Sequence, residues 1–285
     1  MKIRIATRKS RLALAQTDLV IESLKKAFPD METEIIHITT KGDRILDKSL
    51  ETIGGKGVFV SEIEKFLIEN KADIAVHSAK DLPADVAEGL EISGVLERGN
   101  YRDCMVLRKG ESVRNTPEFV FGTGSKRRIL NMQKKYPFAE FKNIRGNVDT
   151  RLEKLKNGEY DALILAVAGL ERLGLYENNF YNVYPFDYSE FLPSACQGII
   201  AIESRKDFSE IIKSINNTET FFQFETERYV LKLLGADCTV PVGAYSEIND
   251  NKISLTVSTD LKKTVSGTAD ISERFELAER LVNQL

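Results

Sequence analysis

The amino-terminal segment changes from a strand-like to a helix-like pattern of apolar residues. Polar and apolar side chains alternate over residues 2–6, which predicts a short strand. Over residues 11–28 the apolar side chains recur at helical spacing, which predicts a helix. The basic stretch Thr7-Arg8-Lys9-Ser10 is then the turn between them. Because a helix N-terminus carries free N–H groups and a partial positive charge, this turn is a candidate anion-binding site.

The same order of elements returns in the middle of the chain. Residues 119–121 read as a strand, Gly122-Thr-Gly-Ser-Lys-Arg-Arg128 as a basic turn, and residues 129–136 as a helix. Residues 67–78 and 155–166 also resemble each other, since in each a helix ends in a polar turn and an aspartate introduces an apolar strand. The repeat predicts two similar α/β domains with parallel sheets. Ligands of such sheets bind at the carboxyl ends of strands, so we expect the domains to face a shared cleft.

The last part of the chain follows a different pattern. Residues 218–234 read as a helix, residues 240–246 and 252–259 as strands, and a terminal helix begins near residue 272. These elements predict a small α+β unit of roughly 65 residues. The expected fold class is therefore α/β, with two similar domains around a central cleft and a small α+β C-terminal domain.

Two segments near the end of the first domain carry candidate chemistry. Gly54-Gly-Lys-Gly57 is a glycine loop before a predicted helix over residues 58–69, and it lacks the spacing of a nucleotide-binding P-loop. It is either a surface turn or a mobile lid whose Lys56 closes on an anion.

The second segment follows a predicted strand over residues 74–76. It places Ser78, Lys80 and Asp81 at the ligand end of the sheet, while His77 points the opposite way and is expected to be packed. The lysine and the carboxylate form either a structural ion pair or a pair in which Asp81 stabilises a developing cation or moves a proton.

The charge balance limits the classes of ligand. The chain has 285 residues, 40 Lys plus Arg and 43 Asp plus Glu, a formal net charge of -3. This mildly acidic balance argues against a general nucleic-acid or membrane-surface binder. A local set of cations nevertheless falls on or near the predicted helix N-termini: Arg8, Arg11, Lys126, Arg127, Arg128, Arg145, Arg151 and Arg172. Because arginine binds carboxylate and phosphate groups bidentately, we expect a polyanionic ligand.

Cysteine and histidine usage excludes further classes. The three cysteines, Cys104, Cys196 and Cys238, form no closely spaced pair, and the chain has only two histidines, so we expect no metal site. Free thiols suit a reducing compartment, and no signal peptide or membrane span is evident, so a cytoplasmic protein is expected. By residue chemistry alone, Cys104 and Cys196 read as packing residues, and Cys238 lacks a nearby cation that would make it a nucleophile.

Several long motifs together resemble one family nearly from end to end. They are Ile5-Ala-Thr-Arg-Lys-Ser10, Gly54-Gly-Lys-Gly-Val-Phe-Val60, Ala72-Asp-Ile-Ala-Val-His-Ser-Ala-Lys-Asp-Leu-Pro83, Ile144-Arg-Gly-Asn-Val-Asp-Thr-Arg151, Asp161-Ala-Leu-Ile-Leu-Ala-Val-Ala-Gly-Leu170, Leu192-Pro-Ser-Ala-Cys-Gln-Gly198 and the Cys238 loop. In this order they resemble the porphobilinogen deaminases, also called hydroxymethylbilane synthases.

The resemblance implies a fold, a reaction and a cofactor. Residues 1–95 with 196–216 would form domain 1 and residues 96–195 domain 2, both shaped like type II periplasmic binding proteins, and residues 217–285 would form domain 3. The enzyme, a transferase of tetrapyrrole (haem) biosynthesis, would condense four porphobilinogen molecules head to tail with release of ammonia. Its primer would be one dipyrromethane per chain, held by a thioether to Cys238, and no metal would take part. A monomer without nucleic-acid or membrane partners is expected.

The resemblance also assigns roles to single residues. Asp81 would contact pyrrole N–H groups, stabilise the cationic azafulvene formed on deamination and assist proton transfer. Lys56 would belong to the lid and Gln197 to the return from domain 2 to domain 1. The cofactor carboxylates would be held by Ser78, Lys80, Thr123, Ser125, Arg127 and Arg128, and the substrate by Arg8, Ser10, Gln16, Arg145 and Arg151.

Three positions depart from the family pattern. Gly124 stands where relatives more often have Ser, Lys126 where they have an apolar residue, and Cys196 where Gly is expected. The first two change the donors of the second anion turn, and the third changes packing near the domain crossover. None of them removes a catalytic residue that the resemblance implies.

A second hypothesis comes from a different class of protein. A two-lobed protein that captures a small anion without reacting would explain the lobes and the arginines equally well. Asp81 and the Cys238 loop favour the deaminase, and a periplasmic binder is expected to carry an export signal. A phosphate-transferring enzyme is disfavoured because no nucleotide-binding loop is present.

Overall fold

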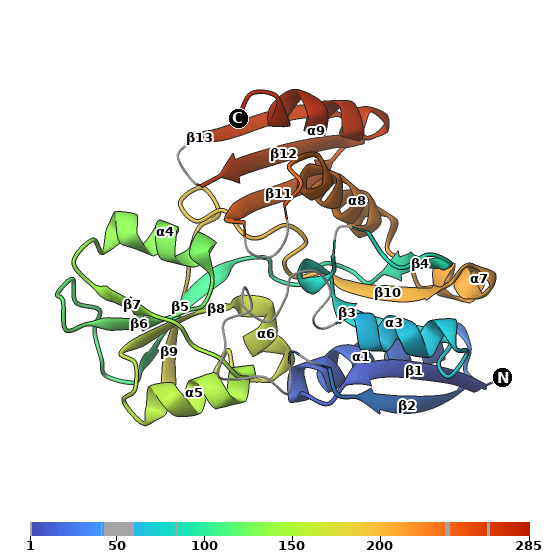
Figure 1. Cartoon of the computed structure of the whole chain (residues 1–285), viewed down its shortest axis with the longest axis horizontal. Coiled ribbons are helices and arrows are strands. Elements are labelled where there is room, and N and C mark those ends of the chain that lie inside the picture. Colours follow the sequence, from blue (N-terminus) through green and yellow to red (C-terminus); the bar gives the residue numbers. More distant parts are fainter. Residues whose placement is uncertain (1, 41, 43–59, 84, 237–239, 261–262) are drawn as a thin grey trace.

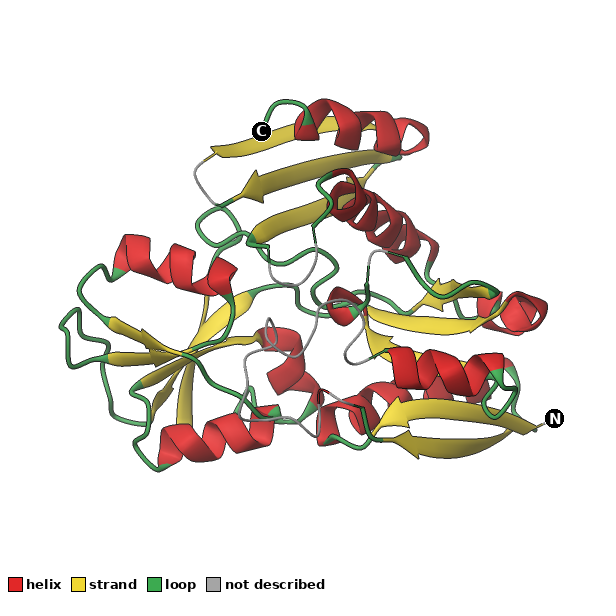
Figure 2. Cartoon of the chain, in the orientation of Figure 1, coloured by secondary structure: helices red, strands yellow, loops and turns green. Residues whose placement is uncertain are grey.

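Three β-sheets with their covering helices make up the protein (Figures 1 and 2), as seen in a computed structural model. The structure describes residues 2–40, 42, 60–83, 85–236, 240–260 and 263–285. Two sheets have five strands each and the third has three, which confirms the predicted fold class. The carboxy-terminal sheet lies at one end of the molecule, above the two larger units in the view of Figure 1.

The first sheet has the strand order β2-β1-β3-β10-β4. Its strands are β1 (Lys2–Arg8), β2 (Glu32–Ile38), β3 (Ile74–Ser78), β4 (Leu90–Val95) and β10 (Ile200–Arg205). Strands β2, β1 and β3 are parallel, whereas β10 is antiparallel to both of its neighbours. The accompanying helices are α1 (Arg11–Ala27), α3 (Ser61–Ile68) and α7 (Ser209–Lys213), with the short 3-10 turns η1 (Ala79–Asp81) and η2 (Lys206–Phe208).

The second sheet has the equivalent order β7-β6-β8-β5-β9. Its strands are β5 (Asp103–Arg108), β6 (Val120–Gly122), β7 (Glu140–Lys142), β8 (Ala162–Ala166) and β9 (Tyr181–Pro185), and its helices are α4 (Lys126–Lys135), α5 (Val148–Lys156) and α6 (Val167–Arg172). Strand β5 is antiparallel to both neighbours, as β10 is in the first sheet. The predicted duplication of the α/β unit is therefore confirmed.

The aspartate that introduces the repeated strand has the same contacts in both units. The Asp73 amide donates to the Arg4 carbonyl, and the Arg4 amide donates back to an Asp73 carboxylate oxygen at 2.8 Å. The Asp161 amide and carboxylate make the corresponding pair with Val120, also at 2.8 Å on the carboxylate side. The aspartate thus completes the hydrogen bonding at the entry of the central strand, which explains why the pattern appears twice in the sequence.

An arginine on the antiparallel strand completes the repeated unit. Arg205 at the end of β10 and Arg108 at the end of β5 each donate through Nη1 to two backbone carbonyls, one at a helix end and one just before the aspartate. The distances lie between 2.7 and 2.9 Å, and the carbonyls are those of Leu67, Ala72, Leu155 and Tyr160. Each arginine therefore ties the end of a helix to the segment that precedes the central strand.

The third sheet, β11-β12-β13, packs one face on two helices. The elements are α8 (Thr218–Leu233), β11 (Val242–Asn249), β12 (Lys252–Thr259), β13 (Lys263–Asp270), η3 (Ile271–Glu273) and α9 (Arg274–Val282). The buried face of β12, with Ile253, Leu255 and Val257, joins Leu277 and Leu281 of α9 in one core. The small α+β unit is confirmed, but β13 was missed because Lys-Thr-Val-Ser-Gly-Thr-Ala-Asp carries only a weak apolar alternation.

Helix and strand boundaries differ from the predicted ones in informative places. The second basic turn is shorter than predicted, because α4 begins at Lys126 and not at residue 129. The Ser125 side chain accepts a hydrogen bond from the Arg128 amide and so caps the helix three residues earlier. Strand β3 continues to Ser78, two residues beyond the predicted end, since its pairing with β10 extends that far.

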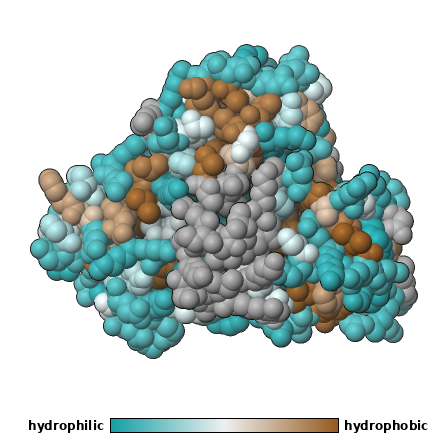
Figure 3. All heavy atoms as spheres, viewed as in Figure 1, coloured by the Kyte–Doolittle hydropathy of each residue, from teal (hydrophilic) through white to brown (hydrophobic). Residues whose placement is uncertain are grey.

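The face drawn in Figure 3 is mostly hydrophilic over the described residues, with separate apolar groups on the three units. The large exposed apolar side chains include Leu19 on α1, Phe138 before β7 and Leu233 at the end of α8. Within the described residues, no helix combines the length and apolar character that crossing a bilayer requires.

Candidate functional site

The first anion turn has the local structure that its sequence predicts. Ser10 caps α1 by accepting a hydrogen bond from the Ala13 amide at 3.3 Å, and Arg8 ends β1 just before it. One turn into the helix, the buried Gln16 side chain donates to the Ser78 hydroxyl at 2.8 Å. Because Ser78 ends β3, this bond fixes the first turn against the carboxyl end of the neighbouring strand.

The second anion turn is built in the same way from residues of the second α/β unit. Ser125 caps α4 at 3.4 Å from the Arg128 amide, and its own amide donates to the hydroxyl of the buried Thr123 at 3.2 Å. The turn therefore has two side-chain hydroxyls, those of Thr123 and Ser125. Gly124 between them is exposed and adds none. Lys126 is exposed as the first residue of α4.

The two arginines of the second turn point inward and share one carboxylate. Arg127 Nη2 lies 2.7 Å from Asp103 Oδ2, and Arg128 Nε lies 2.9 Å from Asp103 Oδ1. Both guanidinium groups also donate to backbone carbonyls, Arg127 to Leu192 at 2.7 Å and Arg128 to Ile164 at 2.9 Å. Asp103 could not be singled out from the sequence, because nothing near it in the chain marks it as a partner of α4.

Lys80 and Asp81 lie on η1, directly after β3, as the sequence predicts. Asp81 is exposed, whereas the Lys80 side chain reaches the Gln197 amide, with Nζ 3.1 Å from Oε1. Gln197 in turn donates to the Tyr101 carbonyl at 2.8 Å. Gln197 therefore connects the lysine to both segments that run between the two α/β units, since Tyr101 lies on one and Gln197 on the other.

The cations of the two units are electrostatic neighbours. Burial and the nearby Arg128 lower the pKa of Lys80 to about 8, although Asp81 and Asp103 act against this. Burial, Arg128 and Arg145 lower the pKa of Arg151 to about 10. Each cation thus lowers the pKa of its neighbours, and the carboxylates near them among the described residues do not cancel this effect.

Arg145 extends this set of neighbouring cations across the two α/β units. Burial and the charge of Arg8 lower the pKa of Arg145, so the turn before α5 lies beside the turn before α1. Arg151 on α5 donates through Nε to the Gly146 carbonyl at 2.8 Å. The two α/β units are also joined directly, because Arg11 Nη1 lies 2.5 Å from Asp149 Oδ1.

Two other predicted positions lie outside this set. His77 is buried and its Nε2 lies 3.0 Å from Glu203 Oε2, which confirms that it is packed. Arg172 donates to the Gly198 carbonyl at 2.5 Å, and burial lowers its pKa to about 10, so it lies at a segment between the units. Lys56 and Cys238 lie outside the described residues.

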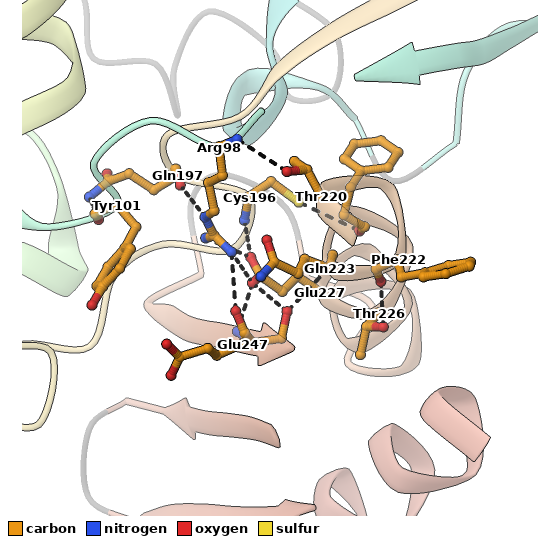
Figure 4. Close-up of polar contacts among 12 residues, drawn as sticks. Arg98, Tyr101, Cys196, Gln197, Thr220, Phe222, Gln223, Thr226, Glu227 and Glu247 are labelled. Carbon is orange, nitrogen blue, oxygen red and sulfur yellow. Dashed lines mark hydrogen bonds and ion pairs between the residues drawn. The ribbon is translucent and has the colours of Figure 1, made fainter. Parts of the chain in front are cut away.

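A buried ion pair joins the two crossing segments to the third sheet (Figure 4). Glu227 on α8 binds Arg98 with both carboxylate oxygens, at 2.6 and 3.2 Å. The same carboxylate accepts hydrogen bonds from the amides of Cys196 at 2.6 Å and Ser246 at 2.8 Å. The Ser246 hydroxyl also donates to it at 2.8 Å, and the exposed fraction of Glu227 is 0%, so five donor atoms meet one fully buried carboxylate.

Cys196 has a backbone conformation that favours glycine. Its φ is 59°, and it is buried with Sγ 3.7 Å from the Phe224 carbonyl. Burial raises the pKa of both the Cys196 and the Cys104 thiols. These two cysteines are therefore packing residues, as predicted. At Cys196 the backbone is strained, and the side chain fills a position beside α8.

Together these features define a class of protein. Two duplicated α/β units bring two serine-capped basic turns, a lysine and several arginines near one exposed carboxylate, an arrangement that suits polyanionic ligands. Within the described residues, no group of three or more His, Cys, Asp or Glu side chains could hold a metal ion.

Comparison with known proteins identifies the family. Residues 3–213 match the family model described as porphobilinogen deaminase, dipyromethane cofactor binding domain, and residues 221–285 match the porphobilinogen deaminase C-terminal domain. The porphobilinogen deaminase of Acetivibrio thermocellus is 45% identical over 259 residues, covering 90% of this chain and 87% of the relative. That of Streptococcus sanguinis is 37% identical over 290 residues, covering 99% and 95%. The chain belongs to the porphobilinogen deaminase family, and the non-catalytic binding protein is not favoured.

Among solved structures, the chain is similar to a putative periplasmic sulfonate-binding protein, SsuA, from Methylobacillus flagellatus. The TM-score is 0.39 with 15% sequence identity, and the match covers 83% of this chain and 70% of that one.

Proposed function

We propose that this protein is a hydroxymethylbilane synthase, a transferase that condenses four porphobilinogen molecules head to tail with release of ammonia. The observation that carries the proposal is the set of mutually repelling cations around Asp81. Each pyrrole of the product brings two carboxylates, so a growing chain would supply negative charge to these cations. Family membership gives the reaction, and the electrostatics of these residues give a physical reason for it.

The residues fit the dipyrromethane primer that the family model names. Its acetate and propionate groups would be held by hydroxyls, by the lysine and by the paired arginines, namely Ser78, Lys80, Thr123, Ser125, Arg127 and Arg128. The chemistry that the primer supplies when bound, through a thioether to Cys238 with one primer per chain, is a free pyrrole carbon for attack on the incoming substrate. The capped second turn supports this assignment, since the N-terminus of its helix favours carboxylates.

Incoming porphobilinogen would be bound by the first turn and by the segment before α5. The side chains that we assign to it are Arg8, Ser10, Gln16, Arg145 and Arg151. Arg145 and Arg8 are electrostatic neighbours, which suits a ligand with two carboxylates. The Gln16–Ser78 bond connects this set to the primer set, so both ligands would meet beside β3.

Asp81 would perform the chemical role at this meeting point. As ammonia leaves the substrate, positive charge develops on the pyrrole ring and its exocyclic carbon, and a carboxylate at the pyrrole N–H groups stabilises that charge. After the new carbon–carbon bond forms, the attacking ring of the bound chain must lose the proton from its newly bonded carbon, and the carboxylate can take up that proton. Its exposure to the space at the end of β3 supports this role.

We also propose a domain organisation, a cellular location and an oligomeric state for the enzyme. Domain 1 would comprise residues 1–95 with 196–216, domain 2 residues 96–195 and domain 3 residues 217–285, with Gln197 at the return and Lys56 on a lid. The contacts of Gln197 with Lys80 and Tyr101 support a hinge at this position. We further propose a cytoplasmic monomer that acts on small molecules without a nucleic-acid partner.

The intact mass of the denatured protein tests the proposed function. We expect an excess of two linked pyrrole units, followed by steps of one pyrrole after porphobilinogen is added. The Cys238→Ser variant is expected to lack the excess, whereas Cys104→Ser, which changes a buried packing cysteine, keeps it. Wild-type protein that gains no pyrrole units, even after preformed hydroxymethylbilane is added, would favour the binding protein instead.

The depressed pKa of Lys80 predicts how primer loading depends on pH. Lys80 loses its charge as the pH rises through about 8, so its attraction for carboxylates weakens above that value. We expect the rate at which hydroxymethylbilane loads the apoprotein to fall between about pH 7 and pH 9. Lys80→Arg should give a flat profile, because a guanidinium group stays charged over this range.

Lys126→Arg is the matched control, since it makes the same change on an exposed residue of α4 and should keep the wild-type profile. A wild-type profile in Lys80→Arg would contradict the role given to Lys80.

The lowered pKa of Lys80 also affects folding. Between about pH 8 and pH 10.5 the unfolded chain binds more protons at this lysine than the folded chain does, so the contribution of Lys80 to the free energy of unfolding rises with pH.

A further inference from the structure

Asp103 is the buried carboxylate on which the second anion turn is built. Its exposed fraction is 0%, and it is the first residue of β5. Arg127 reaches Oδ2 through Nη2 at 2.7 Å, and Arg128 reaches Oδ1 through Nε at 2.9 Å and Nη2 at 2.8 Å. Two arginines that follow each other in the chain are thus held by the two oxygens of one side chain.

The position of Asp103 is itself rigid. Its residue pairs with Ala166 of β8, and its carbonyl accepts a hydrogen bond from the Phe186 amide. The arginines are fixed at their other ends by the carbonyls of Leu192 and Ile164. Each guanidinium group therefore has two fixed partners, which leaves its orientation no freedom to follow a ligand.

The electrostatics favour an ionised Asp103. Burial alone would raise the pKa of its carboxyl, but Arg127, Arg128 and Lys80 together hold it below the usual range. In the absence of this charge, Arg127 and Arg128 would repel each other at close distance, because Arg128 already lowers the pKa of Arg127. One negative charge among three cations keeps the arginines together and leaves the group positive.

We propose that Asp103 is a positioning residue for the reaction, which fixes the Arg127 and Arg128 forks so that they hold the primer carboxylates in one orientation. Asp103 touches neither primer nor substrate, and it acts through the two arginines. The proposal rests on the proposed function, because it needs the primer to be bound by these arginines. A misplaced primer would put its reactive carbon at the wrong distance from the substrate, so kcat is the quantity that Asp103 controls.

The test compares two changes at Asp103. Asp103→Glu keeps the charge but moves it by one methylene, and Asp103→Asn keeps the shape but removes the charge. For Asp103→Glu, we expect kcat per primer-loaded molecule to fall by about 10- to 100-fold while KM for porphobilinogen stays within about twofold. For Asp103→Asn, we expect slower loading and a larger loss of Tm in the apoprotein than in the holoprotein, because primer carboxylates replace part of the lost charge.

Asp73 offers a matched control. It lies just before the start of β3, at the opposite end of this strand from Lys80. It is also a buried carboxylate shared by two arginines, 2.7 Å from Arg4 and 3.7 Å from Arg205. Asp73→Glu and Asp73→Asn should lower Tm without changing kcat per loaded molecule. They show how much activity is lost through stability alone.

The outcomes separate this proposal from the proposed function. Wild-type kcat in primer-loaded Asp103→Glu would overturn the positioning role while the function stands. A kcat loss no greater than that of an Asp73 variant with the same Tm would also overturn it, since the role would then be only structural. Wild-type protein that gains no pyrrole units, even after preformed hydroxymethylbilane is added, would overturn the proposed function, and the positioning role with it.

Discussion

Replacing Asp81 by asparagine is expected to lower kcat by about 100- to 10,000-fold in protein that still carries its primer. The amide has nearly the same size, but it removes the negative charge that would stabilise the substrate cation and the group that would take up the proton. Asp81 is exposed on η1, so the fold should be little affected. The measurement is kcat divided by the primer-loaded fraction, with that fraction taken from intact mass.

Asp85→Asn is the control for this change. Asp85 lies four residues later and pairs at the surface with Lys232 at 3.3 Å, so the same substitution there should leave kcat unchanged. The Asp81 variant should also keep a Tm close to that of the wild type. Turnover within about threefold of the wild type in Asp81→Asn would remove Asp81 from the reaction.

Replacing Glu227 by glutamine is expected to lower the free energy of unfolding by about 3–5 kcal/mol, the largest stability effect that we predict. The carboxylate is fully buried and accepts hydrogen bonds from Arg98, Cys196 and Ser246. Glutamine leaves the Arg98 charge buried without its counter-ion and brings donors where only acceptors fit. Chemical denaturation at constant pH measures the effect.

Glu225→Gln provides the comparison on the same helix. Glu225 is partly exposed and pairs with Arg274 at 2.9 Å, so its loss should cost at most about 1 kcal/mol. A double variant, Arg98→Met with Glu227→Gln, should be less destabilised than the sum of its single variants, because the uncompensated charge is gone. Equal losses in Glu225→Gln and Glu227→Gln would show that the buried pair has no special role.

The fold was largely predictable because the chain repeats its local patterns. A basic turn between an alternating strand and an amphipathic helix appears twice, and both turns proved to be serine-capped helix N-termini. The aspartate before an apolar strand also appears twice and makes the same backbone contacts in both units. Strand β13 could not be predicted, since its side chains are mostly small and polar and its place is decided by pairing with β12.

The candidate site was predictable in its parts but not in its connections. The sequence indicated Arg127 and Arg128 as anion-binding residues, and the structure adds that both are held by Asp103, which comes 24 residues earlier. Glu227 is separated from Arg98 by 129 residues and lies on a helix with ordinary spacing, so no local pattern marks it. In the sequence, each partner of such a buried ion pair appears only as a single charged residue, with nothing nearby that indicates its partner.

Features that depend on neighbours along the chain follow from the amino-acid order alone: helix caps, strand periodicity, the repeated unit and the surplus of arginines near helix starts. The tertiary structure alone decided which charges meet. The depressed pKa of Lys80 arises from elements that are separate in the chain. So do the ion pairs of Asp103 with Arg127 and of Glu227 with Arg98. The physical reason is that electrostatic energy depends on distance and burial, both of which are set only when the sheets pack together.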